Sequence, residues 1–132
     1  RTNVRDLVPD LLPGPVELVV GDLSFISLRL VLPPLVACSL PSADLVLMVK
    51  PQFEVGRESL GAGGVVRDPV LRARAVRDVA AAAAGSGLGV RGVVASPLPG
   101  PSGNVESFLW LCAGAPPLTD EALDRAVREG PQ

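Results

Sequence analysis

At 132 residues the chain has about the length of one domain, and 48% of its residues are hydrophobic, enough for a sizeable core. Its net charge of −2 leaves no basic surplus that would hold a polyanion by counterion release. Histidine is absent and the two cysteines, Cys38 and Cys112, form no CxxC pair, so zinc sites, histidine-based triads and disulfide frameworks have little support. We expect both thiols to be reduced and buried, as in a cytoplasmic protein.

The first half of the chain predicts a strand, a helix and a second strand. The apolar segment 16–22 (VELVVGD) predicts the first strand. A helical pattern follows at 27–38, and we expect it to be bent or interrupted at Pro33 and Pro34. The second strand is predicted at 44–50 (DLVLMVK). No apolar run approaches the ~20 residues of a membrane span.

The second half opens with the clearest helix signal in the chain. Asp68 is a good N-cap, Pro69 suits the first helical position, and Gly85 stops the helix after five alanines. Two more strands and a last helix are predicted after it, at 89–96 (GVRGVVAS), 104–112 (NVESFLWLC) and 119–130.

This order of elements predicts the fold class. Strands that alternate with helices are typical of a mostly parallel α/β sheet. The last two strands are joined by a short loop, so we expect the last strand to be antiparallel. If it also inserts beside the second strand, its beginning lies at the end of that strand. None of the strands alternates strictly between apolar and polar residues, which favours a sheet that is covered on both faces.

Two glycine-rich segments could be mistaken for phosphate-binding loops. The segment 85–92 (GSGLGVRG) follows a helix and precedes a strand, the reverse of the order that a dinucleotide-binding loop needs. We interpret it as a helix stop and a turn. The segment 61–68 (GAGGVVRD) is interpreted as a lid or a connection.

Polar residues at the strand ends predict a site. Ligands of open α/β sheets bind at the carboxyl ends of the parallel strands. Asp22 ends the first strand, Lys50 ends the second, and Glu106 lies near the start of the antiparallel last strand, which would bring it to the same edge. Because neighbouring strands lie ~4.8 Å apart, we expect the three side chains to meet, with two carboxylates flanking one ammonium.

Lys50 is the only lysine among twelve basic residues. A lysine is a compact charge whose proton affinity can be changed, so its presence here suggests chemistry that arginine cannot perform. Another interpretation stays open for each site residue. Lys50 also fits a lysine that is present by chance in an arginine-rich chain. Asp22 also fits a cap or turn residue after the strand, and Glu106 also fits a solvated residue at the start of a strand.

Five motifs resemble the TlyA family of FtsJ-like methyltransferases. In order and spacing these are RTNVRDL, GDLSFISL, LVLMVKPQFEVGRE, GGVVRDP and SPLPGPSGNVESFLWL. The resemblance runs from Arg1 to about Leu111, and VKPQFE followed by GN-x-E makes it specific. Members of this family are S-adenosylmethionine-dependent ribosomal RNA 2′-O-methyltransferases, and some are named haemolysins.

The resemblance implies a truncated Rossmann-like S-adenosylmethionine-dependent methyltransferase fold, the second half of a mostly parallel sheet with an antiparallel last strand. Residues 1–132 would form a partial FtsJ-like methyltransferase domain, with the first strands, the cofactor loop and an RNA-binding domain upstream. The resemblance also implies a Lys-Asp-Lys-Glu catalytic tetrad, whose last three members are Asp22, Lys50 and Glu106. Asn3 and Asp22 are the implied cofactor-binding residues.

The implied activity is 2′-O-methylation of ribosomal RNA in the cytoplasm, with cytidine as the expected target. The expected partners are ribosomal RNA or ribosomal subunits, with no membrane, and we expect the chain to be inactive by itself. Lys50 would contact the ribose 2′-hydroxyl and favour its alkoxide or accept its proton, while Asp22 and Glu106 hold the ammonium in place. Because two carboxylates favour the ammonium form, we expect Lys50 to act by orientation and electrostatics.

Other interpretations remain open beside this one. A catalytically silent RNA- or protein-interaction module is the alternative function. A membrane-active haemolysin is a third interpretation, and the absence of an amphipathic basic helix from the sequence speaks against it. Phe53 fits base stacking or a place in the core. The edge of the strand at 16–22 is expected to be unpaired and to promote self-association. The arginines at 67, 72, 74 and 77 fit either a surface that contacts RNA or a solvated face of the helix.

Overall fold

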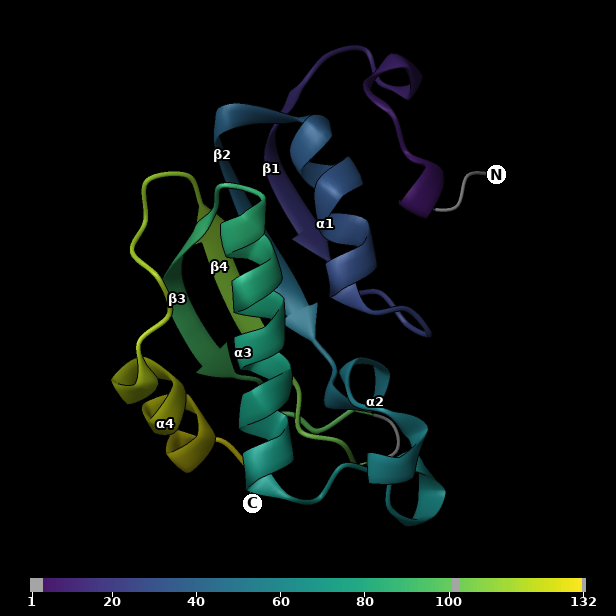
Figure 1. Ribbon diagram of the computed structural model, residues 1–132, viewed down its shortest axis with the longest axis vertical. Helices are drawn as coiled ribbons and strands as arrows, with labels where there is room; N and C mark the ends of the chain where they lie inside the picture. The colour runs from purple at the N-terminus through teal and green to yellow at the C-terminus, as the bar shows by residue number, and fades with distance from the viewer. Residues whose placement is uncertain (1–3, 101–102, 132) are drawn as a thin grey trace.

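The computed structural model describes residues 4–100 and 103–131, which contain one four-stranded sheet (Figure 1). Within the sheet β1 is parallel to β2, while β4 is antiparallel to both of its neighbours, β2 and β3. This arrangement confirms the α/β class and the antiparallel last strand, and it places that strand beside the second. The strands are β1 (Val16–Gly21), β2 (Ser39–Val49), β3 (Gly89–Ala95) and β4 (Ser107–Cys112), in the order β1-β2-β4-β3.

All three predicted helices form, and each begins at a side-chain cap. Ser27, Asp68 and Thr119 each accept a hydrogen bond from a backbone N–H in the first turn of the helix that follows. A fourth, four-residue helix directly after β2 was not predicted. The helices are α1 (Leu28–Ala37), α2 (Pro51–Glu54), α3 (Pro69–Gly85) and α4 (Asp120–Glu129), and short 3-10 turns lie at Val4–Asp6, Pro9–Leu11, Arg57–Ser59 and Ala62–Gly64.

Helix α1 runs through Pro33 and Pro34, so the interruption expected there does not occur. Each proline removes one backbone hydrogen bond and costs a helix interior about 3 kcal/mol. Val31 and Leu32 are fully buried and Leu35 is nearly so, which fixes one side of the helix in the core. Burial of this side offsets the local penalty, an effect that the proline pair alone could not reveal.

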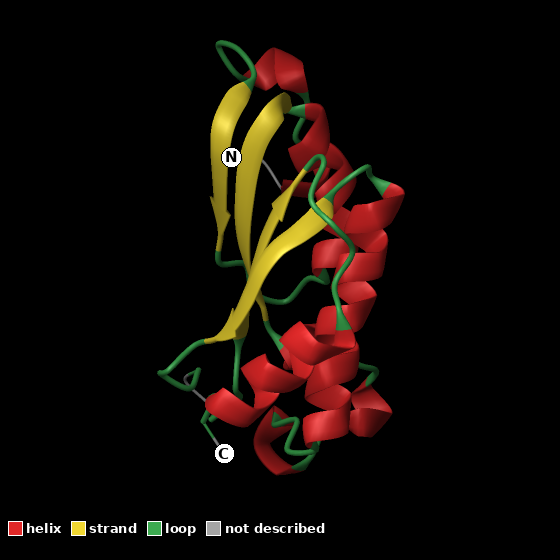
Figure 2. Cartoon of the chain, turned by 90° about the vertical axis from the view of Figure 1, so that its left-hand side faces the viewer, coloured by secondary structure: helices red, strands yellow, loops and turns green. Residues whose placement is uncertain are grey.

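The helices α1, α3 and α4 all cover the same face of the sheet (Figure 2). Along β2 the residues toward these helices are buried, whereas the residues between them are half-buried. The expectation of a sheet covered on both faces is therefore wrong for the described residues. Among the helices of these residues, none is long and apolar enough to cross a membrane. The bare face and the β1 edge expose large apolar side chains: Leu18 59%, Val20 74%, Val94 57% and Trp110 42%.

The turn between α3 and β3 confirms that the glycine-rich segment is a helix stop. Gly87 adopts a left-handed φ of 84°, and Leu88 N donates to Ala83 O at 2.9 Å. Strand β3 begins directly after Leu88, at Gly89, where a side chain would overlap the backbone carbonyl of Ala115. The next amide, Val90 N, donates to Pro116 O at 2.7 Å, so this close approach ties β3 to the segment before α4.

We predict that Gly89→Ala lowers the free energy of unfolding by about 1–3 kcal/mol, because the added methyl group must displace backbone atoms. Gly85→Ala is the matched control, since a methyl group there meets nothing within 4 Å and replaces a helical glycine. The control should retain stability or gain up to about 1 kcal/mol. Urea denaturation of both variants checks this, and equal midpoints would contradict it.

Candidate active site

Asp22 and Lys50 meet at the carboxyl edge of the sheet. Asp22 follows β1 directly and Lys50 follows β2, and near this edge Gly21 pairs with Leu47. Lys50 Nζ forms an ion pair with the Asp22 carboxylate and donates a hydrogen bond to Ser24 Oγ at 3.2 Å. The Lys50 side chain is 11% exposed and that of Asp22 is 65% exposed. A nearly buried ammonium is thus held by a carboxylate that remains open to solvent.

Glu106 reaches the same edge from the antiparallel strand. It directly precedes β4, whose first residue, Ser107, pairs with Val49 of β2. The Glu106 side chain is buried and accepts a hydrogen bond from Gln52 Nε2 at 3.3 Å. Glu106 and Lys50 line one cavity of about 380 Å³, but the ion pair of Lys50 is with Asp22.

The predicted meeting of three charged side chains is therefore realised for Asp22 and Lys50 and not for Glu106. The physical reason is the unpredicted helix α2, which begins directly after Lys50. Its first turn brings the Gln52 amide to the edge, where it hydrogen-bonds the Glu106 carboxylate.

Two aromatic rings lie at this cavity. Phe25 and Phe53 both line it, and their ring centroids are 5.1 Å apart with an interplanar angle of 48°. Phe25 is 89% exposed and has a φ of 65°, a left-handed conformation that is strained for a residue with a bulky side chain. Phe53 is half-buried against it. An exposed ring on a strained backbone next to a charged pair is a feature of binding surfaces rather than of a core.

Asn104 fixes the glycine-rich wall of the cavity. Its side chain is 1% exposed, and its Oδ1 accepts from Val66 N at 2.8 Å. Its Nδ2 donates to Gly64 O at 3.1 Å. Gly63 and Gly64, both with left-handed φ values, line the cavity. The segment interpreted as a lid or connection is thus a turn that a buried amide holds at the site.

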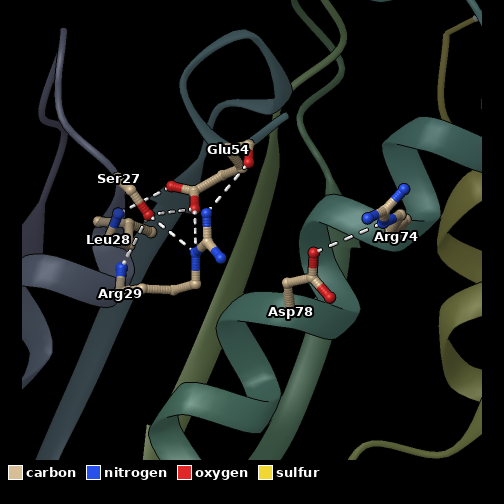
Figure 3. A network of polar contacts seen from close by, with 6 residues as sticks. All are labelled: Ser27, Leu28, Arg29, Glu54, Arg74 and Asp78. Atoms are coloured by element: carbon tan, nitrogen blue, oxygen red, sulfur yellow. Dashed lines mark hydrogen bonds and ion pairs between the residues drawn. The ribbon is translucent and has the colours of Figure 1, made fainter. Parts of the chain in front are cut away.

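Glu54, the last residue of α2, joins this short helix to the first turn of α1 (Figure 3). Its carboxylate accepts from Ser27 Oγ at 2.6 Å and from Leu28 N at 2.8 Å, at the first turn of α1. Arg29 Nε lies 3.5 Å from the same carboxylate, whose side chain is 1% exposed. Burial raises the pKa of the Glu54 carboxyl, although the hydrogen bonds from Ser27 and Leu28 and the charge of Arg29 act in the opposite direction.

Sequence reasoning missed the residues that build the surroundings of the charged pair. In the sequence Gln52, Glu54 and Asn104 stand out only as parts of the motifs that carry the family resemblance, because a polar residue in a short segment does not reveal its distant partner. Phe25 gave no signal, since its exposure and its φ depend on the turn before α1. Asn3, the implied cofactor-binding residue, lies outside the described residues.

The arginines around α3 have partners within the chain. Arg72 Nε donates to Val66 O at 3.0 Å, and Arg74 and Arg77 form ion pairs with acidic residues of α3 and α4. These contacts favour a helix face that serves the fold. Within residues 4–100 and 103–131 no group of three or more His, Cys, Asp or Glu side chains is placed to hold a metal ion.

Comparison with known proteins places this geometry in context. The model of the FtsJ-like methyltransferase family matches residues 1–113. The chain is 57% identical to the 16S/23S rRNA (cytidine-2′-O)-methyltransferase TlyA of Mycobacterium tuberculosis, over 99% of this chain and 51% of that protein. It is 41% identical to YqxC of Bacillus subtilis, over 98% of this chain and 48% of that protein. The chain therefore spans about half the length of the curated relatives it matches.

Two solved structures share the fold. A hemolysin-named protein from Lactococcus lactis has a TM-score of 0.88 at 33% identity, over 97% of this chain and 62% of that chain. A hemolysin-named protein from Streptococcus thermophilus has a TM-score of 0.85 at 34% identity, over 97% of this chain and 49% of that chain.

We predict that Glu54 makes the stability of the chain depend on pH. Because its pKa is raised in the folded state, the stabilising contribution of its protonated form is complete below the ordinary value of 4.5. That contribution is lost as the pH rises through the folded-state pKa. Along this rise the free energy of unfolding of wild type should fall relative to that of Glu54→Gln, which cannot ionise.

Urea denaturation at several pH values measures this difference. Asp78→Asn is the matched control, because it makes the same chemical change in an exposed pair in which Arg74 Nε lies 3.8 Å from Asp78 (Figure 3). A difference between wild type and Glu54→Gln that does not vary with pH would show that Glu54 contributes no such term.

Proposed function

Because the chain belongs to the FtsJ-like methyltransferase family, we propose that it carries the reacting residues of an enzyme that methylates a ribose 2′-hydroxyl of ribosomal RNA. The observation that carries this proposal is the ion pair of Lys50 with Asp22 at the carboxyl edge of the sheet, next to a cavity that Lys50 and Glu106 both line. The name of TlyA, the relative at 57% identity, supports the substrate class and the cytidine target. On this proposal residues 1–132 are part of an FtsJ-like domain that acts in the cytoplasm on ribosomal RNA or ribosomal subunits.

Lys50 is the residue proposed to contact the reacting hydroxyl. Its ammonium would stabilise the negative charge that develops on the 2′-oxygen as this oxygen takes the methyl group and its proton passes to solvent at the open side of the site. Asp22 orients this ammonium through the ion pair, and the Ser24 hydroxyl oxygen accepts a second hydrogen bond from it. Glu106, buried and bonded to Gln52, would fix the opposite wall, where it can accept a hydrogen bond from a ribose hydroxyl.

The methyl donor proposed for this site is S-adenosylmethionine, which supplies an electrophilic methyl group. The structure offers room for it in an open cavity of about 950 Å³ beside the charged pair. Val4, Leu23 and Ile26 provide an apolar lining that suits an adenine ring. Asp22 is the candidate to contact a polar or cationic part of the donor, together with Asn3.

The aromatic pair supports a nucleic acid substrate. Proteins that recognise unpaired RNA bases stack them on exposed aromatic rings, and Phe25 lines the cavity and is largely exposed. The net charge of −2 gives the chain little attraction for the RNA backbone. Strong binding would then come from basic residues elsewhere in the protein, with this site selecting and orienting one nucleotide.

The decisive test compares Lys50→Arg with wild type in the full-length product of the gene that encodes this chain. We expect methyl transfer from labelled S-adenosylmethionine to ribosomal subunits to fall at least about 100-fold with arginine, because the planar guanidinium cannot take the position of the compact ammonium. Arg74→Lys, on the exposed side of α3, is the matched control and should retain activity.

Equal transfer by wild type and Lys50→Arg would make Lys50 a charge holder and contradict the proposed role. If wild type transfers no methyl group either, the alternative of a catalytically silent RNA- or protein-interaction module gains support.

We also propose that the chain by itself self-associates through β1. This strand forms the edge of the sheet, and Leu18 and Val20 on it are exposed. Sedimentation should reveal concentration-dependent dimers that Leu18→Lys weakens, whereas Val70→Lys on α3 should not, although Val70 is 72% exposed. A wild-type chain that stays monomeric over the same concentrations would contradict this proposal.

A further inference from the structure

One buried polar atom at the candidate active site has no partner. The side-chain oxygen of Gln52, Oε1, is shielded from solvent, and no donor among the described residues lies within hydrogen-bond distance. A buried acceptor without a donor is costly, and such atoms in native proteins call for an explanation. Gln52 also lines the cavity that contains Lys50 and Glu106. Gln52 therefore lies in the wall between this cavity and the larger one proposed for the methyl donor, so that a molecule bound there could supply the missing donor.

The orientation of the Gln52 amide is fixed by its neighbour. Its Nε2 donates to Glu106 Oε2 at 3.3 Å. The flipped amide would place two oxygens against each other, since an ionised carboxylate is an acceptor only. The amide group thus offers an acceptor, and not a donor, to anything that enters the cavity.

The backbone that carries Gln52 is also held in place. Pro51 occupies the first position of α2, and Glu54 anchors the end of this short helix to Ser27, Leu28 and Arg29 (Figure 3). These contacts hold the backbone of Gln52 at the wall of the cavity.

We propose that Gln52 selects the target base by accepting a hydrogen bond from its exocyclic amino group. This inference rests on the proposed function. Lys50 and Glu106 account for the ribose hydroxyls, while Phe53, the residue after Gln52, and Phe25 line the same cavity with flat apolar rings suited to a base. Cytosine presents an amino donor where uracil, equal in size, presents a carbonyl oxygen. Uracil would place that oxygen against Gln52 Oε1, so the cavity favours cytosine.

The experiment uses the full-length product of the gene that encodes this chain and ribosomal subunits in which the methylated nucleotide, once mapped, is cytidine or uridine. For wild type we expect kcat/KM at least about tenfold higher on cytidine, because uracil leaves a buried acceptor unpaired. Gln52→Met keeps the length of the side chain and removes the amide. It should lower kcat/KM on cytidine, raise it on uridine, and bring the two within about threefold.

The ratio of kcat/KM on cytidine to kcat/KM on uridine isolates the base contact from the other effects of the substitution. Loss of the hydrogen bond to Glu106 changes both reactions alike, and so does any loss of stability. A gain on uridine is an effect that a merely structural residue cannot produce. Affinity for short RNAs that differ only in this nucleotide, measured by fluorescence anisotropy, gives a second readout. Asp78→Asn is the control and should keep the wild-type ratio.

The outcomes separate this inference from the proposed function. Methyl transfer by wild type with a ratio that Gln52→Met leaves unchanged, or equal losses on both nucleotides, would overturn the role of Gln52 alone. No methyl transfer by wild type would overturn both. If Gln52→Met does not fold, as judged by its thermal melting, Gln52→Asn shortens the reach of the oxygen and should narrow the same ratio.

Discussion

The buried carboxylate of Glu54 is the contact on which the geometry of the site depends. It accepts two hydrogen bonds at the first turn of α1 and lies beside the Arg29 guanidinium, while it belongs to α2. The loop before α1 carries Asp22, and the residue before α2 is Lys50. One carboxylate therefore sets the spacing between two segments that are distant in the sequence. Its burial is costly in isolation, and the amide, hydroxyl and guanidinium donors offset part of that cost, so burial still raises the pKa of the carboxyl.

A second constraint is the reversal of β4 within the sheet. Because β4 runs antiparallel between β2 and β3, its beginning lies at the edge where β2 ends. Glu106 and Asn104 thus join Lys50, although they precede their strand and Lys50 follows its own. Asn104 in turn holds the glycine turn at 61–66, which closes one side of the cavity. The sheet topology and two buried polar side chains together build a cavity wall from four separate segments.

The site combines one ammonium with several acceptors and two aromatic rings. The ammonium is paired, the Glu106 carboxylate is bonded to Gln52, and the Gln52 oxygen has no donor in the described part of the chain. Phe25 adds a strained backbone and an exposed ring. Features that cost stability in this way cluster at functional sites, where a ligand can repay them. The bare apolar face and the β1 edge are separate features, because they lie away from these polar contacts and concern association.

The sequence by itself determined the helices α1, α3 and α4, the strands and two residues of the charged edge. Caps at Ser27, Asp68 and Thr119, the glycine stop after α3 and the apolar runs act over a few residues, so the sequence shows them directly. Only the tertiary structure decided that α1 continues through its prolines and that Glu106 bonds to Gln52. It also decided that Glu54 joins α1 to α2. The last two outcomes depend on contacts between residues that are far apart in the sequence. Leu28 and Glu54 are separated by 26 positions, and Gln52 and Glu106 by 54 positions, so their geometry is fixed only when the sheet has formed.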